Sequence, residues 1–353
     1  MKILFLTYFF EPDLCAGSFR NSSLLKELHA RVGDGDTIDV YTTQPNRYDS
    51  YKVEAESFEK RGDNLTITRI NIPKHKSGML SQIKSFIVYY FEISKKTRNK
   101  KYDLVYVSSG RFFSTFLAAK IARRNSAKLY LDIRDIFIET IMDVFKSVFM
   151  KFILKLILTP IENYIFKRAD HINLVSKGFK SYFDKYSDCT YSYFTNGIDD
   201  VFLNVNKGVN ITLENNITRK KKTILYAGNI GESQGLHIIL PSIAKAFKNE
   251  FEFLVFGDGG AKQKLVNSIS EGSVSNIKIM NPINRETLIE EYKKADFLFL
   301  HLNKQLAFER VLPSKLFEYG AFNKPVIAGV SGYSAEFLKK EMINCILFNP
   351  GDS

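Results

Sequence analysis

The sequence predicts an α/β protein made of two doubly wound halves. Short apolar runs of the kind buried in parallel sheets alternate with helical patterns along most of the 353 residues. The alternation stops once, at a polar stretch of weak apolar periodicity over residues 204–222, and restarts at Thr223. We therefore expect two domains, residues 1–205 and residues 206–353, each large enough for a core of its own.

The first half opens with the apolar run Lys2–Tyr8. This run ends in Glu11, Pro12 and Asp13 rather than in a small-residue cleavage site, so it indicates a buried strand and not a signal peptide. Further strands are predicted at Ile38–Thr42, Leu65–Asn71, Asp103–Ser108, Lys128–Ile133 and His171–Val175. Helical periodicity falls between them, for example at Ser22–Arg31 and Ser114–Arg124.

The second half repeats this pattern from Thr223 onward. Strands are predicted at Thr223–Ala227, Glu252–Gly257, Ile277–Met280, Asp296–His301 and Pro325–Ala328. Helices are predicted at Gly235–Phe247, Arg285–Lys294 and Ser314–Phe322. The last helix follows a Pro and a Ser and so presents a helix N-terminus, which is a favourable place for an anion.

Composition narrows the class of protein. The formal charge of +12 favours a polyanionic partner, namely nucleic acid, an anionic membrane surface or a phosphorylated substrate. Three widely spaced cysteines, Cys15, Cys189 and Cys345, indicate neither a disulfide framework nor a zinc site, which suits the cytosol. The longest apolar stretch, Val144–Phe166, is interrupted by charged residues, so no transmembrane helix is predicted.

A glycine-containing loop, Ala16, Gly17 and Ser18, follows the first strand. Loops at this place form the usual anion site of a doubly wound sheet. The loop lacks the G-x-G-x-x-G spacing, which argues against a dinucleotide-dependent dehydrogenase.

Seven motifs, taken in order, resemble those of the retaining glycosyltransferase family four. They are E-P-D-L-C-A-G-S-F-R, R-A-D-H-I-N-L-V-S, T-N-G-I-D, L-Y-A-G-N-I-G-E-S-Q-G-L, L-V-F-G-D-G-G, Y-K-K-A-D-F-L-F-L and P-S-K-L-F-E-Y-G-A. Within that family the chain resembles bacterial enzymes of surface-polysaccharide (O-antigen or capsule) synthesis.

The resemblance implies the GT-B fold, in which two Rossmann-like domains face each other across a cleft. The first domain would bind the acceptor and the second the nucleotide-sugar donor. The family continues beyond the last strand with helices that this sequence lacks, so we expect a truncated C-terminus. The implied reaction is metal-independent transfer, without a cofactor, of an N-acetylhexosamine from a UDP-linked donor to a lipid-linked saccharide.

Glu318 is the first donor-site residue that the resemblance implies. It matches the second acid of the family's E, seven residues, E pattern, whose carboxylate accepts hydrogen bonds from the ribose hydroxyls. The alternative is a Glu that only complements a helix dipole. The first acid of the pattern is replaced by Arg310, so either Glu309 takes its place beside the donor sugar or the sugar contact differs. Leu316 and Gly257 fall in the same matched segments, and both of these residues and Pro282 are expected near the donor.

The diphosphate site departs from the family. Its basic residues align with Asn229 and Gln234 in the loop that starts at Gly228. Backbone N–H groups of that loop and Ser314 can still hold a phosphate, and Lys315 is the candidate for the missing charge. A solvated first-turn lysine is the alternative for Lys315.

On the acceptor side, I-R-D-I-F resembles the family's His-Asp position. Arg134 then stands for the His as a possible phosphate partner, and Asp135 is the candidate acceptor-side residue. The alternative is an Arg and an Asp that merely pair at a strand end. Arg20 is expected in the phosphate or acceptor loop with Ala16, Gly17 and Ser18. The D-x-D in Gly33–Asp36 falls where a turn is expected, and not a metal motif.

Two basic, aromatic stretches, Ser81–Lys101 and Phe145–Leu158, suit the surface of an anionic membrane. The alternative is a core helix whose lysines reach past apolar neighbours to water. No nucleic-acid-binding module is found, so we expect a protein on the inner face of the cytoplasmic membrane. Two other functions stay open: a non-catalytic, nucleotide-binding partner of a transferase, and a nucleotide-sugar epimerase of the same fold.

Overall fold

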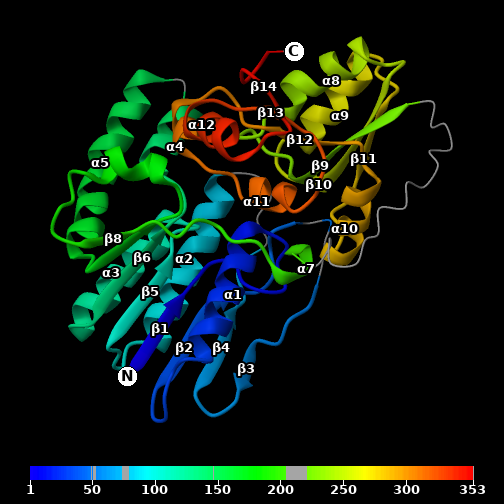
Figure 1. The fold of residues 1–353 in the computed structure, drawn as a ribbon. Helices are drawn as coiled ribbons and strands as arrows, with labels where there is room; N and C mark the ends of the chain where they lie inside the picture. Colours follow the sequence, from blue (N-terminus) through cyan, green and yellow to red (C-terminus); the bar gives the residue numbers. More distant parts are fainter. Residues whose placement is uncertain (49, 51–52, 74–78, 146, 204–220, 353) are drawn as a thin grey trace. The chain divides into compact units, whose positions relative to one another are not determined.

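The computed structural model describes residues 1–48, 50, 53–73, 79–145, 147–203 and 221–352 (Figure 1). The described residues form two compact units: the first contains Met1–Arg47 and residues 53–195, and the second contains Tyr48 and Ser50 together with the residues from Asn196 onward. The predicted domain boundary between residues 205 and 206 lies outside the described residues.

The first unit holds an eight-stranded sheet in the order β3-β4-β2-β1-β5-β6-β7-β8. All neighbouring strands are parallel except β3, which runs antiparallel to β4 at the edge. The strand order reverses between β1 and β5, as in a doubly wound sheet. The strands are β1 (Lys2–Leu6), β2 (Thr37–Thr43), β3 (Phe58–Arg61), β4 (Leu65–Ile70), β5 (Leu104–Ser108), β6 (Lys128–Ile133), β7 (His171–Leu174) and β8 (Thr190–Ser192).

Alternation along β1 divides its side chains between the two faces of the sheet. Ile3 and Phe5 pack with Leu25 of α1 in one core cluster. The segment predicted as a turn, Gly33–Asp36, is confirmed as one. The helices of this unit are α1 (Ala16–His29), α2 (Met79–Lys96), α3 (Phe112–Asn125), α4 (Phe137–Val144), α5 (Val148–Arg168) and α6 (Lys180–Phe183).

The second unit holds a six-stranded sheet in the order β11-β10-β9-β12-β13-β14, parallel throughout. Its order reverses between β9 and β12, so the second unit is doubly wound as well. The strands are β9 (Lys222–Asn229), β10 (Phe251–Asp258), β11 (Ile277–Met280), β12 (Phe297–His301), β13 (Val326–Gly329) and β14 (Cys345–Phe348). The helices are α7 (Asp200–Leu203), α8 (Leu236–Ala246), α9 (Lys262–Glu271), α10 (Arg285–Lys294), α11 (Lys315–Gly320) and α12 (Gly332–Glu341).

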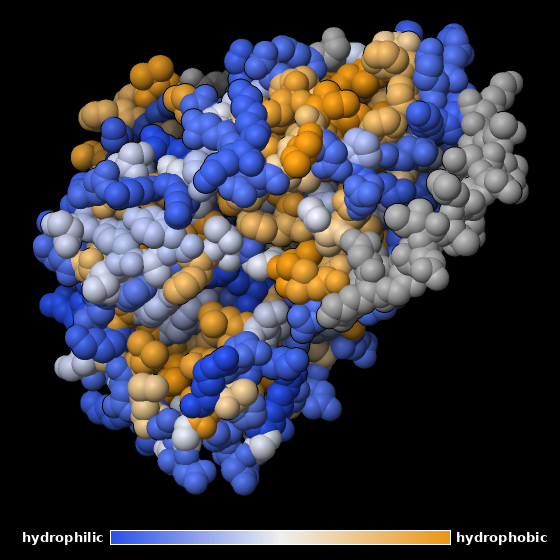
Figure 2. All heavy atoms as spheres, viewed as in Figure 1, coloured by the Kyte–Doolittle hydropathy of each residue, from blue (hydrophilic) through white to orange (hydrophobic). Residues whose placement is uncertain are grey.

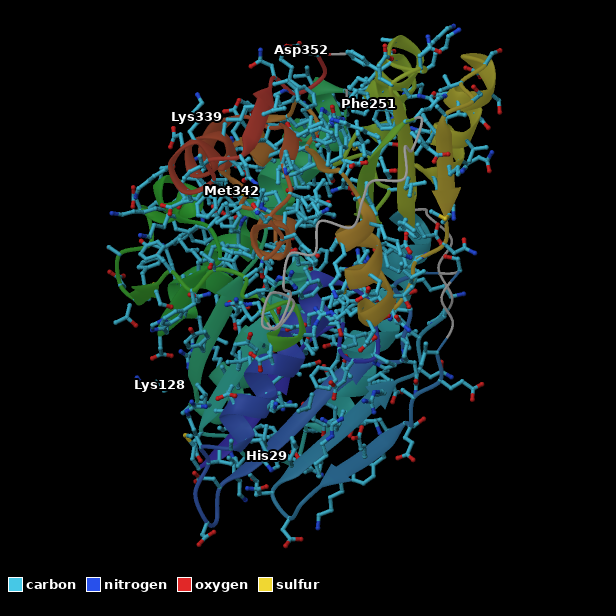
Figure 3. All side chains as sticks on the ribbon, turned by 45° about the vertical axis from the view of Figure 1, so that its right-hand side comes forward. His29, Lys128, Phe251, Lys339, Met342 and Asp352 are labelled. Carbon is cyan, nitrogen blue, oxygen red and sulfur yellow. The ribbon has the colours of Figure 1, made fainter. Side chains whose placement is uncertain are left out.

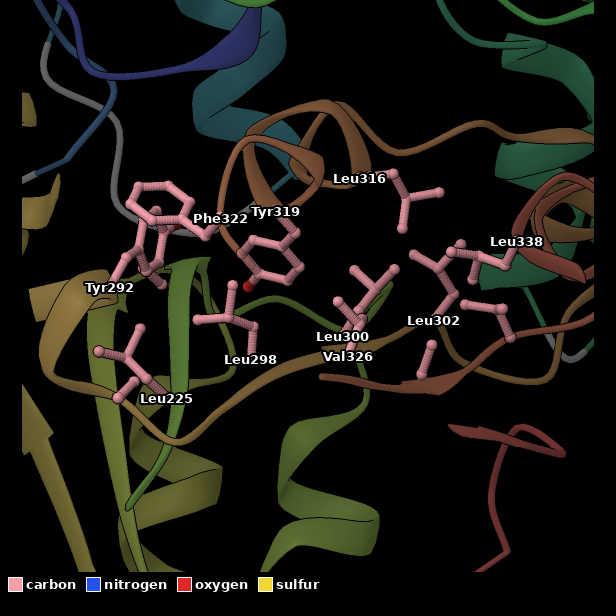
Figure 4. Packing of buried hydrophobic residues seen from close by; sticks show 14 of the residues in the cluster. Leu225, Tyr292, Leu298, Leu300, Leu302, Leu316, Tyr319, Phe322, Val326 and Leu338 are labelled. Carbon is pink, nitrogen blue, oxygen red and sulfur yellow. The ribbon is translucent and has the colours of Figure 1, made fainter. Parts of the chain in front are cut away.

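One core of the second unit joins the β9–β12–β13 face to α10, α11 and α12 (Figure 4). The rings of Tyr292 and Phe322 meet edge to face with 5.1 Å between their centroids, and Tyr292 meets Tyr319 in the same way. Tyr319 also donates a hydrogen bond to the carbonyl of Phe299 in β12. These contacts fix α11 on the sheet and so determine where Lys315 and Glu318 lie.

Candidate functional site

The first candidate site lies at the carboxyl end of β9. The backbone of Gly228 has φ of +140°, in the left-handed region that favours glycine, and a side chain there would collide with the side chain of Lys315. The Lys315 ammonium lies 4.9 Å from the centre of the Tyr226 ring, within the range of a cation–π contact. Gly228 thus admits a cation from α11 to the end of β9, the edge at which doubly wound sheets bind ligands.

Asn229 and Gln234, where the family has basic residues, bond to each other. The Asn229 side-chain amide donates to Gln234 Oε1 at 2.8 Å, and the backbone N–H of Gly231 donates to the same oxygen at 3.2 Å. This pair closes the loop between β9 and α8 without adding charge. In this part of the described chain, Lys315 provides the positive charge beside Gly228.

Glu318 lies one turn after Lys315 on α11 and is half-buried. The Tyr292 hydroxyl donates to its carboxylate at 3.4 Å. Burial raises the pKa of the Glu318 carboxyl, while the nearby charges of Lys315 and Arg285 lower it. The carboxylate is therefore an acceptor group flanked by two cations.

Arg285 is a basic neighbour of Glu318 that the sequence analysis did not identify. It is the first residue of α10, and it forms an ion pair with Asp199 of the T-N-G-I-D motif. Burial lowers the pKa of Arg285, and the charge of Glu318 opposes that change. Arg285 therefore links Asp199 of the T-N-G-I-D motif to Glu318.

The other predicted donor-side residues differ in exposure. Leu316 is buried in the core, and Gly257 pairs with Gly228 across β10 and β9. Glu309 is exposed, while Arg310 is half-buried at the end of a 3-10 turn, Leu306–Arg310. Half-buried positions are also occupied by Ser314, which precedes α11, and by Pro282, which follows β11. The predicted helix Ser314–Phe322 is shorter in the structure, since α11 covers Lys315–Gly320.

The second candidate site lies at the carboxyl edge of the first sheet, where β1 leads into α1. Ala16, Gly17 and Ser18 form the first turn of α1, whereas the sequence analysis placed them in a loop before a helix at Ser22–Arg31, so that placement was wrong. The Arg134 guanidinium, which follows β6, rests against Gly17 where a side chain would collide with it. His29 at the end of α1 and Lys128 at the start of β6 mark the opposite edge of this sheet (Figure 3).

Asp135, next to Arg134, is an exposed residue at the end of β6. The backbone N–H of Arg134 donates to the Ser109 hydroxyl at 2.7 Å, which ties the end of β6 to the residue after β5. The predicted pair Arg134 and Asp135 therefore lies at the carboxyl edge of the sheet, beside the switch point.

Arg20 has a different environment from the loop residues with which it was predicted. Its guanidinium forms two 2.8 Å hydrogen bonds with the carboxylate of Asp132, which is 1% exposed. It also donates to the carbonyls of Thr195 and Phe194, at 2.6 and 3.0 Å. Arg20 is thus committed to a buried network that holds the last residues of the first unit.

Two arginines of this region, Arg47 and Arg111, were missed by the sequence analysis. Arg111 is the N-cap residue of α3, and its guanidinium carbon lies 5.1 Å from the centre of the Tyr8 ring. Both guanidinium carbons lie 5.6 Å from the centre of the Phe9 ring. A signal did exist for Arg111 and Arg285, because a basic residue at a helix start opposes the helix dipole and needs a local reason.

Part of the second unit matches a known protein family. Residues 210–353 match the family described as "Glycosyl transferases group 1". This match, which covers part of the chain, supports the sequence-based prediction of a glycosyltransferase. Among curated proteins the chain is 32% identical over 96 residues to glycosyl transferase WcaI of Escherichia coli (strain K12), which is named for colanic acid biosynthesis. That alignment covers 27% of this chain and 23% of WcaI, so the chain matches about a quarter of this relative's length.

Solved structures resemble the whole chain. WaaG, described as a glycosyltransferase involved in lipopolysaccharide biosynthesis, superimposes with a TM-score of 0.70 at 13% identity, covering 99% of this chain and 87% of WaaG. Anabaena HepE in complex with UDP-glucose gives a TM-score of 0.65 at 14% identity, covering 100% of this chain and 86% of HepE. At these identities the likeness shows the fold, and it confirms two Rossmann-like domains of the GT-B type.

The described residues contain no group of three or more His, Cys, Asp or Glu side chains arranged to hold a metal ion. In the same part of the chain, none of the helices combines the length and hydropathy needed to cross a bilayer.

Proposed function

We propose that this protein is a retaining, metal-independent glycosyltransferase of family four. It transfers an N-acetylhexosamine from a UDP-linked donor to a lipid-linked saccharide in bacterial surface-polysaccharide synthesis, on the inner face of the cytoplasmic membrane. The donor binds to the second unit and the acceptor to the first.

The observation that carries the proposal is the pair formed by Glu318 and Lys315 on α11. A ribose offers two neighbouring hydroxyl donors, and a carboxylate offers two acceptor oxygens, so Glu318 suits the ribose. A diphosphate needs a cation and backbone N–H groups, which Lys315 and the loop after Gly228 supply. Structures that bind UDP and UDP-glucose share the fold, and this supports UDP as the nucleotide.

A lipid-linked acceptor requires contact with a membrane, and the amino-terminal half of α5 fits that task. Val148, Phe149, Phe152 and Leu156 are 80, 71, 66 and 66% exposed. Orange, apolar atoms lie among blue, hydrophilic ones over α5 at the upper left of Figure 2. The same half of α5 contains Lys151 and Lys155. Apolar side chains exposed beside lysines are typical of helices that lie in the surface of an anionic bilayer.

Calorimetric titration tests the donor site. We expect UDP to bind the purified chain more tightly than GDP, and Glu318→Ala to remove most of the UDP affinity. Glu271→Gln changes an exposed carboxylate at the end of α9 and serves as the matched control. Failure of the folded chain to bind any nucleotide would refute the proposal.

Vesicle co-sedimentation tests the membrane surface. We expect binding to vesicles that contain phosphatidylglycerol but weak binding to pure phosphatidylcholine. Phe149→Ser with Phe152→Ser should reduce binding at least tenfold, because each phenyl ring gains about 1.5–3 kcal/mol on leaving water. Phe58→Ser, which alters a ring that is 59% exposed on β3, is the control. Equal binding by the double variant and the unchanged chain would contradict this part of the proposal.

A further inference from the structure

Two helices of the first unit begin with a cation at the positive end of the helix dipole. α1 follows β1 and α3 follows β5, the two strands between which the sheet order reverses. Each helix has 14 residues and no acidic residue in its first turn, and no described side chain caps either one. Instead, the Arg134 guanidinium lies against Gly17 in the first turn of α1, and Arg111 is the N-cap of α3. A cation at this end of a helix is unfavourable unless an anion also binds there.

Arg47 adds a third guanidinium to the same edge of the sheet. Arg47 and Arg111 both lie over the ring of Phe9, in the segment between β1 and α1. Burial lowers the pKa of Arg111, and the positive charge of Arg47 lowers it further. The two guanidinium groups are therefore close enough to repel each other. Burial raises the pKa of Asp135, while the charges of Arg134 and Arg47 both lower it. The loops after β2, β5 and β6 thus bring three cations to the same edge of the sheet, with Asp135 beside them.

Asp13 supplies one buried carboxyl group to this cluster. Its Oδ1 accepts hydrogen bonds from the backbone N–H groups of Asn46 and Arg47, at 3.0 and 2.9 Å. Asp13 is 5% exposed, and burial raises the pKa of its carboxyl to about 6. The carboxyl therefore fixes the backbone of Arg47, and its single negative charge, mostly present at pH 7, balances at most one of the three guanidinium groups.

Hydrogen-bonding capacity is left over inside the cluster. Among the described residues, the Nε atom of Arg134 and the hydroxyl of Ser18 are buried without a hydrogen-bond partner. Ser18 lies in the first turn of α1 and is 0% exposed. Buried polar atoms without a partner are costly, and a bound ligand is one way to satisfy them.

We propose that this cluster, formed by Arg47, Arg111, Arg134 and the first turns of α1 and α3, binds a phosphate or diphosphate group of the acceptor. Planar guanidinium groups and the N–H groups of helix starts are the donors that phosphate oxygens accept best. The inference rests on the proposed function in taking the ligand to be the acceptor. The second unit has its own cation for the donor diphosphate, Lys315, so the cluster in the first unit is assigned to the other substrate. The acceptor would then be a saccharide carried on a lipid phosphate or diphosphate.

Binding measured without turnover tests this assignment. The full chain is titrated calorimetrically with geranyl diphosphate, with inorganic pyrophosphate and with geraniol, each in the presence of saturating UDP. We expect geranyl diphosphate and pyrophosphate to bind and geraniol not to bind. Arg111→Gln and Arg134→Gln should each weaken geranyl diphosphate binding about 10- to 100-fold, the usual effect of losing a charge-assisted hydrogen bond, and leave UDP affinity unchanged. Arg123→Gln, an exposed arginine near the end of α3, is the matched control.

Thermal unfolding of each variant shows whether it is folded. Arg111→Lys, which keeps the positive charge, should retain more of the affinity for geranyl diphosphate than Arg111→Gln. Displacement of geranyl diphosphate by UDP would overturn the assignment, because the cluster would then hold the donor phosphates. A folded chain that binds UDP but neither diphosphate probe would overturn it as well. A chain that binds both diphosphate probes but no nucleotide would support an anion site here and refute the proposed function separately.

Discussion

Replacing Glu318 by Gln separates the contribution of this residue to binding from its effect on stability. The carboxylate would accept two ribose hydroxyl groups, whereas the Gln amide keeps one acceptor oxygen. One charge-assisted hydrogen bond is worth about 1.5–3 kcal/mol, so we expect the affinity for UDP to fall about 10- to 150-fold. Calorimetry with UDP measures this change directly.

The same substitution should not destabilise the ligand-free protein. Burial raises the pKa of Glu318, so the folded state favours the protonated carboxyl. That contribution to the free energy of unfolding is fully present below the ordinary pKa of about 4.3 and is lost as the pH rises through the raised value. At pH 7.5 the neutral Gln avoids the cost of a partly buried charge, so the variant should have an equal or higher unfolding temperature. The difference from the unchanged chain should shrink as the pH falls toward 4.

The reasoning would be refuted by a variant that binds UDP normally, since Glu318 would then have no ribose role. A marked fall in unfolding temperature at pH 7.5 would refute the electrostatic part, because it would mean that the charge stabilises the fold. The UDP affinity and the unfolding temperature can both be measured on one protein preparation. A loss of affinity with retained stability is the result that we expect.

Three further substitutions test other parts of the structure. Lys315→Met should weaken the affinity for UDP about 10- to 100-fold and leave the affinity for uridine unchanged, because uridine has no phosphate. An equal loss of affinity for uridine would contradict a phosphate role for Lys315. Arg20→Ala leaves Asp132 as an unpaired buried charge and should lower the free energy of unfolding by about 3–5 kcal/mol in urea denaturation; an unshifted midpoint would show that the pair is dispensable. Leu338→Ala opens a cavity in the core of the second unit and should lower the free energy of unfolding by about 2–5 kcal/mol. Leu306→Ala, which alters a side chain that is 72% exposed, should change it little.

The strands that bury both faces were predictable, because their apolar runs are short and bounded by polar residues. Each predicted strand, from Lys2–Tyr8 to Pro325–Ala328, is present within two residues of its expected ends. β3 was missed since Phe58–Arg61 has one apolar residue among three charged ones, and Phe58 is 59% exposed. This strand forms only through pairing with β4, a long-range contact that no local pattern records.

The candidate sites were predictable in their location but not in their partners. The motifs place Gly17 shortly after β1 and Gly228 at the carboxyl end of β9, where doubly wound sheets bind ligands. Which cation approaches each glycine depends on loops that are distant in sequence, as with Arg134 at Gly17 and Lys315 at Gly228. Arg20 lies beside the predicted anion loop in sequence, but its guanidinium pairs with Asp132 and does not serve that loop.

The loop between β9 and α8 also has a consequence for how this sequence can change over time. Gln234 accepts from both Asn229 and Gly231, so a single change of Gln234 to Lys would break two hydrogen bonds. It would also add a second positive charge to the loop whose first glycine Lys315 already contacts. Restoring the family's basic pair should therefore be harmful one step at a time and tolerated only if residues 229, 234 and 315 change together. The three positions are expected to behave as one evolutionary unit, in which the charge can sit on the loop or on α11.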